Sequence, residues 1–116
     1  MRSRILLTTT GRRTGLPRKV ELYAFDDGDR LVVVGSQGGS TRDPAWCHNL
    51  RANPAARLRR GRKATTEESV LAHEAAGAER DRLWALVTGV SPFYVGFQRK
   101  TQRVIPLFVL ERQAPG

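Results

Sequence analysis

The hydrophobic and polar positions in the first third of the chain follow the patterns of β-strands. Residues 5–10 are apolar and β-branched and stop at Gly11, whereas residues 19–25 alternate apolar and polar side chains, which is typical of a half-buried strand. Residues 31–35 are continuously apolar, which indicates a central strand. The Asp-Asp-Gly-Asp run at residues 26–29 is typical of a hairpin turn. These segments predict a β-meander.

A helical pattern follows the meander. Asp43 precedes Pro44, which predicts a helix start with Asp43 as the N-cap and Pro44 in the first turn. Trp46 and Leu50 are four residues apart and therefore share one helix face. The Asn-Pro pair at residues 53–54 predicts the end of this helix.

A second hairpin and a last strand are expected further on. Residues 56–60 and 64–73 predict two strands around Gly61, with one solvated face. Residues 104–110 predict the final strand. Because proline has no N–H to donate, Pro106 places that strand at a sheet edge or at a bulge.

Two helices lie between the second hairpin and the last strand. Residues 78–87 predict an amphipathic helix that turns Leu83, Trp84 and Val87 inward, and residues 92–100 predict a short helix. Hairpins dominate, and strands do not alternate regularly with helices as they do in parallel sheets. The order therefore predicts a mainly β (α+β) fold, an antiparallel barrel with helices packed on it.

The length and the charge limit the protein classes that remain. The 116 residues fit a single domain, which we expect to span residues 1–112 and to end in a frayed tail at 113–116. The net charge is +9, from 20 Lys and Arg against 11 Asp and Glu. This charge favours an anionic partner, which leaves nucleic acid, lipid headgroups and polyanionic small molecules open.

The cysteine count and the apolar runs bear on location. Cys47 is the lone cysteine, which excludes an internal disulfide and fits a reducing compartment. The apolar runs are all shorter than the roughly 20 residues that a membrane-spanning helix needs. We therefore expect a cytoplasmic protein, with contact to the inner face of the plasma membrane as an open alternative.

Two turns carry the strongest chemical signal. Residues 11–15 read Gly-Arg-Arg-Thr-Gly, and residues 35–40 read Gly-Ser-Gln-Gly-Gly-Ser; both follow predicted strands. Glycine exposes backbone N–H groups, the hydroxyl side chains add donors and arginine adds charge, so together the turns would receive a phosphate or a carboxylate. The alternatives are an exposed hairpin turn with solvated arginines and a flexible connector.

The helix after the second turn offers no nucleophile and base pair. Cys47 and His48 are neighbours, and neighbours on a helix diverge by about 100°, so they cannot act as a dyad. His48 also lacks partners at metal-ligand spacing. Trp46 and Asn49 are three residues apart and could line a pocket; the alternative is that Trp46 packs with Leu50 in the core.

Two further segments allow a functional and a structural interpretation. Residues 91–100 are rich in aromatic side chains, which could form a stacking wall with the Tyr94 hydroxyl as a proton donor, or could simply pack in the core. Residues 57–63 are strongly basic, which suits nucleic acid or a membrane surface but is also typical of a solvated hairpin tip.

Four segments taken in order carry a family resemblance. They are LLTTTGRRTGLPR at residues 6–18, SQGG at 36–39, PAWCHNLRANP at 44–54 and Ile-Pro at 105–106. Together they resemble the deazaflavin-dependent nitroreductase family. The resemblance implies a split β-barrel of about six antiparallel strands with three short helices, related to flavin-binding barrels. It also implies reduced coenzyme F420 as hydride donor, and quinones or nitroaromatics as acceptors.

The resemblance also implies roles for particular residues. The cofactor-binding residues that it implies are Arg12, Arg13, Thr14, Ser36, Gln37, Gly38, Gly39, Trp46 and Asn49. The first three would bind the phosphate and oligoglutamate tail, the next four would approach the phosphate, and the last two would lie beside the coenzyme. Tyr94 would face the acceptor and is the catalytic candidate. The family often has Lys where Gln37 stands and Tyr where Cys47 stands.

Because a deazaflavin carries the redox chemistry itself, the resemblance agrees with the missing dyad. We therefore expect an F420-dependent oxidoreductase without a metal site and without a nucleic-acid partner. The alternatives are a non-catalytic F420 carrier, an FMN-binding protein and a basic nucleic-acid-binding domain. A homodimer also remains open, since exposed strand edges can pair between copies.

Overall fold

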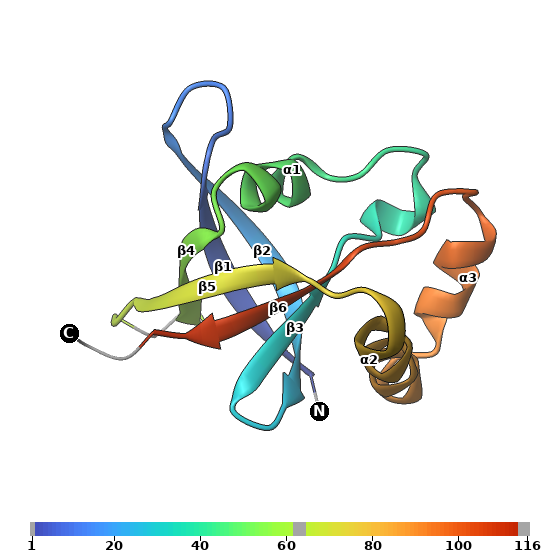
Figure 1. The fold of residues 1–116 in the computed structure, drawn as a ribbon. Helices are drawn as coiled ribbons and strands as arrows, with labels where there is room; N and C mark the ends of the chain where they lie inside the picture. The colour runs from blue at the N-terminus through green and yellow to red at the C-terminus, as the bar shows by residue number, and fades with distance from the viewer. Residues whose placement is uncertain (1, 62–64, 114–116) are drawn as a thin grey trace.

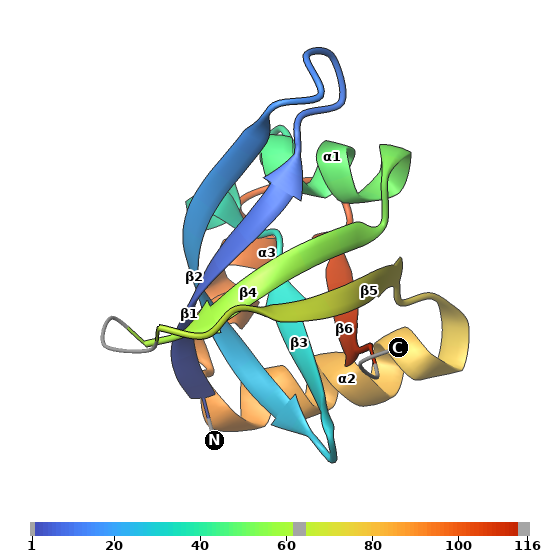
Figure 2. The ribbon, with the colours of Figure 1, turned by 90° about the vertical axis from the view of Figure 1, so that its left-hand side faces the viewer.

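The structure is a computed structural model that describes residues 2–61 and 65–113. Within these residues, six antiparallel strands close into a barrel in the hydrogen-bonded order β1-β2-β3-β6-β5-β4 (Figures 1 and 2). The strands are β1 (Arg2–Thr10), β2 (Pro17–Asp27), β3 (Arg30–Val34), β4 (Ala55–Arg60), β5 (Glu68–Glu74) and β6 (Leu107–Arg112). The helices are α1 (Ala45–Ala52), α2 (Gly77–Val90) and α3 (Phe93–Arg99), with a short 3₁₀ turn η1 (Gln37–Gly39). The predicted fold class is confirmed.

The barrel has an open side along β2. β2 pairs with β1 from Pro17 to Phe25, but it pairs with β3 only from Ala24 to Asp27. In the described part of the chain, the other edge of residues 17–23 therefore meets no strand. The turn between β1 and β2 projects beyond the barrel at the end where α1 lies (Figures 1 and 2). This arrangement leaves room for a groove between β2 and α1.

The continuous apolar pattern of β3 reflects burial on both faces. Leu31 and Val33 face the barrel interior, whereas Val32 and Val34 belong to a second core that includes Leu83 of α2. Both α2 and α3 lie on this outer side of β3 and β6 (Figure 1). A strand covered on both faces has no polar face to present, which explains why β3 does not alternate.

The predicted cap of α1 is wrong by one residue. Pro44 is the N-cap, with extended backbone angles, and no side chain caps the helix. The carboxylate of Asp43 instead accepts hydrogen bonds from Arg51 at 2.9 Å and Arg103 at 2.7 Å. Two charge-assisted contacts are stronger than one bond to a backbone N–H, so Asp43 is drawn away from the helix.

Three other predicted details differ from the structure. β6 begins at Leu107 and pairs with both β3 and β5, so Pro106 lies before the strand and not at an edge or bulge. The Pro106 carbonyl accepts the Gly35 N–H at 2.8 Å. β5 begins at Glu68 and not at residue 64, which lies outside the described residues. Trp84 is only half-buried, although its two predicted core neighbours are fully buried.

The end of the domain is only partly described. The Gln113 N–H donates to the Ser69 carbonyl at 2.9 Å, and residues 114–116 lie outside the described part of the chain. None of the described helices combines the length and apolarity needed to cross a bilayer.

Candidate functional site

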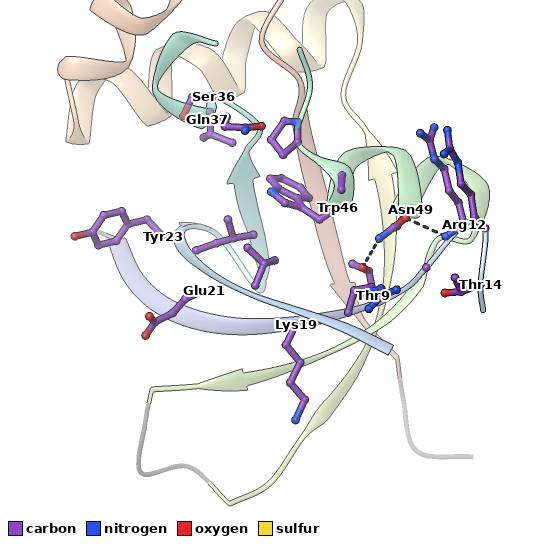
Figure 3. A pocket seen from close by; sticks show the side chains of 18 of the residues that line it. Thr9, Arg12, Thr14, Lys19, Glu21, Tyr23, Ser36, Gln37, Trp46 and Asn49 are labelled. Carbon is purple, nitrogen blue, oxygen red and sulfur yellow. Dashed lines mark hydrogen bonds between the residues drawn. The ribbon is translucent and has the colours of Figure 1, made fainter. Parts of the chain in front are cut away.

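A groove of about 830 Å³ lies along the open edge of β2 (Figure 3). One wall comes from β2, and the opposite wall comes from the loop after β3 and the first turns of α1. The turn between β1 and β2 closes one end, and Tyr94 is the one lining residue from α3. A volume of this size suits a cofactor-sized ligand.

One end of the groove is strongly cationic. Arg12, Arg13, Arg18 and Lys19 all line it. In the described part of the chain, none of the four forms an ion pair with a carboxylate. Glu21 is the one acidic residue of the lining, and its Oε1 forms an ion pair with Arg4 Nη1 at 3.9 Å. The groove therefore offers several positive charges to an anion.

The Gly-Arg-Arg-Thr-Gly turn is closed by its own hydrogen bonds. The Gly15 N–H donates to the Gly11 carbonyl, and the Gly11 N–H donates to the Leu16 carbonyl, both at 2.8 Å. Gly15 adopts a φ of +72°, where a side chain would be strained. A Cβ on Gly11 would lie 2.9 Å from the Thr14 hydroxyl oxygen. Both glycines are therefore needed for a turn this tight.

Asn49 joins α1 to this turn. The residue is 5% exposed, its Oδ1 accepts the Arg12 N–H at 3.0 Å, and its Nδ2 donates to the Thr9 hydroxyl at 3.1 Å. Figure 3 shows Asn49 between these two partners. The amide is thus largely occupied within the protein, so Asn49 fixes the backbone of the arginine turn as well as lining the groove.

The Ser-Gln-Gly-Gly segment divides into two parts. Ser36 and Gln37 line the groove, whereas Gly38 and Gly39 do not. A Cβ on Gly39 would lie 2.7 Å from the Phe97 carbonyl oxygen, so this glycine permits close packing on α3. In the described part of the chain, the N–H groups of residues 36, 37 and 38 donate to no backbone carbonyl. These N–H groups remain available as donors.

Trp46 and Tyr94 supply aromatic surface. Trp46 is 6% exposed and packs edge-to-face on Phe108 with ring centroids 5.8 Å apart, yet it also lines the groove. Trp46 therefore belongs to the core and also lines the groove. Tyr94 is equally buried, and burial raises the pKa of its phenol. Phe93 and Phe97 do not line the groove, so Tyr94 is what remains of the expected stacking wall.

Cys47 is unavailable for nucleophilic chemistry. It is completely buried, and burial raises the pKa of the thiol. In the described part of the chain, no three His, Cys, Asp or Glu side chains come close enough to hold a metal ion. The arrangement is therefore suited to binding an anionic ligand with a flat apolar part.

Comparison with known proteins identifies the family. Residues 1–112 match the family model described as F420H(2)-dependent quinone reductase. The chain belongs to this family. Its similarity to the F420H(2)-dependent quinone reductase Rv1261c of Mycobacterium tuberculosis (strain ATCC 25618 / H37Rv) is 39% identity over 112 residues, covering 94% of this chain and 73% of the relative.

Solved structures agree with the assignment to the F420H(2)-dependent quinone reductase family. The structure of an F420-H2 dependent reductase (FDR-A) has a TM-score of 0.81 and 33% identity, covering 94% of both chains. A structure described as a domain-swapped dimer has the same TM-score and 35% identity, covering 94% of this chain and 80% of that one. The predictions of an F420-dependent oxidoreductase and of F420 as cofactor are confirmed at the level of the family.

The β2 wall of this reductase-family groove was not predicted from the sequence. Arg18, Val20 and Leu22 line it, and so does Tyr23. The Tyr23 hydroxyl accepts a hydrogen bond from Arg4 at 3.5 Å, which lowers the pKa of this exposed phenol. The alternation of residues 19–25 predicted the strand, but no local signal shows which of its edges is left without a partner.

Proposed function

We propose that this chain reduces a quinone with coenzyme F420 bound in the groove along β2. The observation that carries the proposal is that one groove is lined by four cations without carboxylate partners in the described part of the chain, by residues with free backbone N–H groups, and by Trp46 and Tyr94. When bound, the reduced deazaflavin supplies a hydride. The protein supplies binding, orientation and exclusion of water.

The cationic end suits the tail of the coenzyme, a phosphate followed by carboxylates. Arg12 and Arg13 would bind these groups through charge-assisted hydrogen bonds, with the Thr14 hydroxyl as a further donor. The free N–H groups of Ser36 and Gln37 would receive the phosphate. Gly38 does not line the groove and would contribute by allowing the turn, since its φ is +64°.

The apolar part of the groove suits the flat ring system. Trp46 would pack against it, opposite Val20 and Leu22 of β2. Gly39 would act indirectly, by letting the loop at residues 35–40 pack closely on α3. Asn49 would also act indirectly, by holding the backbone of the arginine turn. Water is thereby kept from the side of the ring that faces the core.

Reduction of a quinone to the hydroquinone adds one hydride and one proton to each molecule at neutral or mildly acidic pH. Tyr94 lines the groove, and its raised pKa keeps the phenol protonated, so it can donate a hydrogen bond to the acceptor oxygen. Tyr23 has the more acidic phenol of the two and is a second candidate for the proton donor. Water would then return a proton to the phenolate.

Further statements on acceptors, assembly, location and domain extent belong to the same proposal. Nitroaromatic compounds would be accepted as alternatives to quinones, because they too are flat electrophiles. A homodimer is supported by the 35% identical structure described as a domain-swapped dimer. The protein would work in the cytoplasm and contact the inner face of the plasma membrane through its basic surface, with residues 1–112 as one domain.

The direct test is a fluorescence titration of the purified chain with F420, followed by assays of reduced F420 with a panel of quinones and nitroaromatics. We expect binding at micromolar concentration and quinone-dependent oxidation. Binding without oxidation by any acceptor would support the carrier alternative. FMN that displaces F420 at equal concentration would favour a flavin protein, and failure to bind F420 would overturn the proposal.

A further inference from the structure

Arg103 lies outside the groove but contacts the loop that forms one of its walls. Its Nε donates to the Ser40 carbonyl at 2.7 Å, and its Nη2 donates to the Ser36 carbonyl at 2.8 Å. Its Nη1 donates to the Gly35 carbonyl at 3.0 Å and to Asp43 Oδ1 at 2.7 Å. All three nitrogens of one guanidinium are thus used on a single loop.

These contacts enclose a strained turn. Gln37, Gly38 and Gly39 have φ values of +43°, +64° and +81°, and Gln37 is the one non-glycine residue with a positive φ in the described part of the chain. Glycine adopts a positive φ without strain, but Gln37 keeps one only where the surroundings impose it. Arg103 holds the carbonyls directly before and directly after this turn, so it is placed to impose the conformation.

The contacts also set the direction of the free donors. No peptide bond of the described chain is cis, and in a trans peptide the C=O and the next N–H point in opposite directions. Because Arg103 holds the carbonyls of Gly35 and Ser36, the N–H groups of Ser36 and Gln37 point away from it. Ser36 and Gln37 line the groove on that far side, whereas Arg103 does not line it.

Arg103 is itself held in place and already neutralised. The Gln98 side chain donates to the Arg103 carbonyl at 2.7 Å, and the Arg103 N–H donates to the Thr101 hydroxyl at 3.3 Å. Its side chain is 14% exposed and forms an ion pair with Asp43. Four of the five guanidinium N–H groups are thus engaged within the protein, so Arg103 has little left to offer a ligand.

We propose that Arg103 is the positioning residue of the phosphate-binding loop: by holding the carbonyls of Gly35, Ser36 and Ser40, it directs the N–H groups of Ser36 and Gln37 toward the anion. The proposal rests on the proposed function, because it assigns that anion to the phosphate of F420. A lysine could not replace Arg103, since one ammonium cannot reach acceptors on both sides of the turn.

The test compares two ligands on Arg103→Lys, which keeps the charge and most of the side-chain volume. The ligands are F420 and the deazaflavin riboside that lacks the phosphate and the tail. We expect the Kd for F420 to rise about tenfold, as for the loss of oriented charge-assisted donors, while the Kd for the riboside changes less than about twofold. A purely structural role would weaken both ligands equally.

Arg80→Lys is the matched control. Arg80 also donates to a backbone carbonyl, that of Ile105 at 2.7 Å, two residues after Arg103. It forms no hydrogen bond with the loop at residues 35–40, which the structure describes in full. We expect it to leave the ratio of the two Kd values as in the unsubstituted chain. Thermal unfolding of each variant establishes that it is folded at the titration temperature.

A second variant keeps the proposal testable if Arg103→Lys does not fold. Asp43→Asn removes the charge that orients the guanidinium but leaves its three carbonyl contacts, so we expect a selective loss of about threefold for F420. The proposal is overturned if folded Arg103→Lys has the same ratio of the Kd for F420 to the Kd for the riboside as the unsubstituted chain. If Arg103→Lys does not fold, the same result in Asp43→Asn overturns it. An unsubstituted chain that binds neither ligand overturns the proposed function instead.

Discussion

At the scale of single residues, the groove depends on side chains whose role is to hold others. Arg12 and Arg13 carry the charge, but Asn49 fixes the backbone from which they project. A buried amide that satisfies two partners is costly to remove, because each partner then loses its hydrogen bond away from water. Loss of a direct contact such as that of Arg13 should therefore lower F420 affinity alone, whereas loss of a supporting contact such as that of Asn49 should also lower the free energy of unfolding.

Arg13→Glu tests a direct contact. Reversing this charge should weaken F420 binding by at least about tenfold, because an attraction to the anionic tail becomes a repulsion. Fluorescence titration measures the loss. Arg57→Glu makes the same change in net charge at an exposed position of β4 that does not line the groove, and it should leave the Kd nearly unchanged. Equal losses in the two variants would contradict a local role for Arg13.

Asn49→Ala tests a supporting contact. We expect the free energy of unfolding to fall by about 1–3 kcal/mol, because the Arg12 N–H and the Thr9 hydroxyl lose their partner. F420 affinity should fall as well, since the arginine turn is no longer held. Urea unfolding and F420 titration measure the two effects. Asn53→Ala, at the exposed end of α1, is the control, and it should leave F420 affinity unchanged.

At the scale of elements, ion pairs fix the helices to the barrel. Asp27, at the end of β2, accepts hydrogen bonds from Arg82 of α2 at 3.0 Å and from Arg30 of β3 at 2.7 Å. These bonds, that from Arg82 first, lower the pKa of the carboxyl from 3.8 to about 2. The hairpin between β2 and β3 is thereby joined to α2.

Asp27→Asn should show a stability loss that depends on pH. A carboxylate with a lowered folded pKa stabilises the protein above its ordinary pKa, and this contribution disappears as the pH falls through the folded value. We expect a loss of about 1 kcal/mol at about pH 7 that shrinks between about pH 4 and pH 2. Urea unfolding across this range measures it. Asp29→Asn changes the same charge in the adjacent turn, and a matching pH-dependent loss there would contradict the assignment.

At the scale of the whole molecule, the net charge of +9 does not by itself locate the site. Several arginines are engaged by carboxylates, among them Arg30, Arg51 and Arg82. The four cations of the groove are not so engaged in the described part of the chain, and they line the same groove as Ser36 and Gln37, whose N–H groups donate to no backbone carbonyl. The excess positive charge is therefore available where the coenzyme tail is proposed to lie.

This distribution predicts different salt dependences for F420 and FMN. F420 carries several carboxylates beyond its phosphate, whereas FMN carries the phosphate alone. Raising the salt concentration from about 50 to about 500 mM should therefore weaken the binding of F420 by about tenfold and the binding of FMN by clearly less. Parallel fluorescence titrations measure both. Identical salt dependences would mean that the groove does not recognise the tail by its charge.

Much of the fold was predictable because its signals are local. The alternation of residues 19–25 and the helical spacing of Trp46 and Leu50 arise from backbone periods of two and 3.6 residues, which any stretch of sequence displays by itself. Pro106 could not be placed in this way, since its carbonyl accepts the N–H of Gly35, which is far away in the sequence. The same limit applied to Asp43, whose carboxylate binds Arg103, sixty residues further along.

The sequence by itself determined the strands, the helices and the two turns that suit an anion, because glycine geometry and side-chain chemistry act over a few residues. Only the tertiary structure decided that β2 keeps one edge open, that Asn49 holds the arginine turn, and that Arg103 holds the glycine turn from behind. Each of these depends on which distant segments meet when the barrel closes. Such pairings are set by the packing of the whole chain and leave no periodic signal in any one segment.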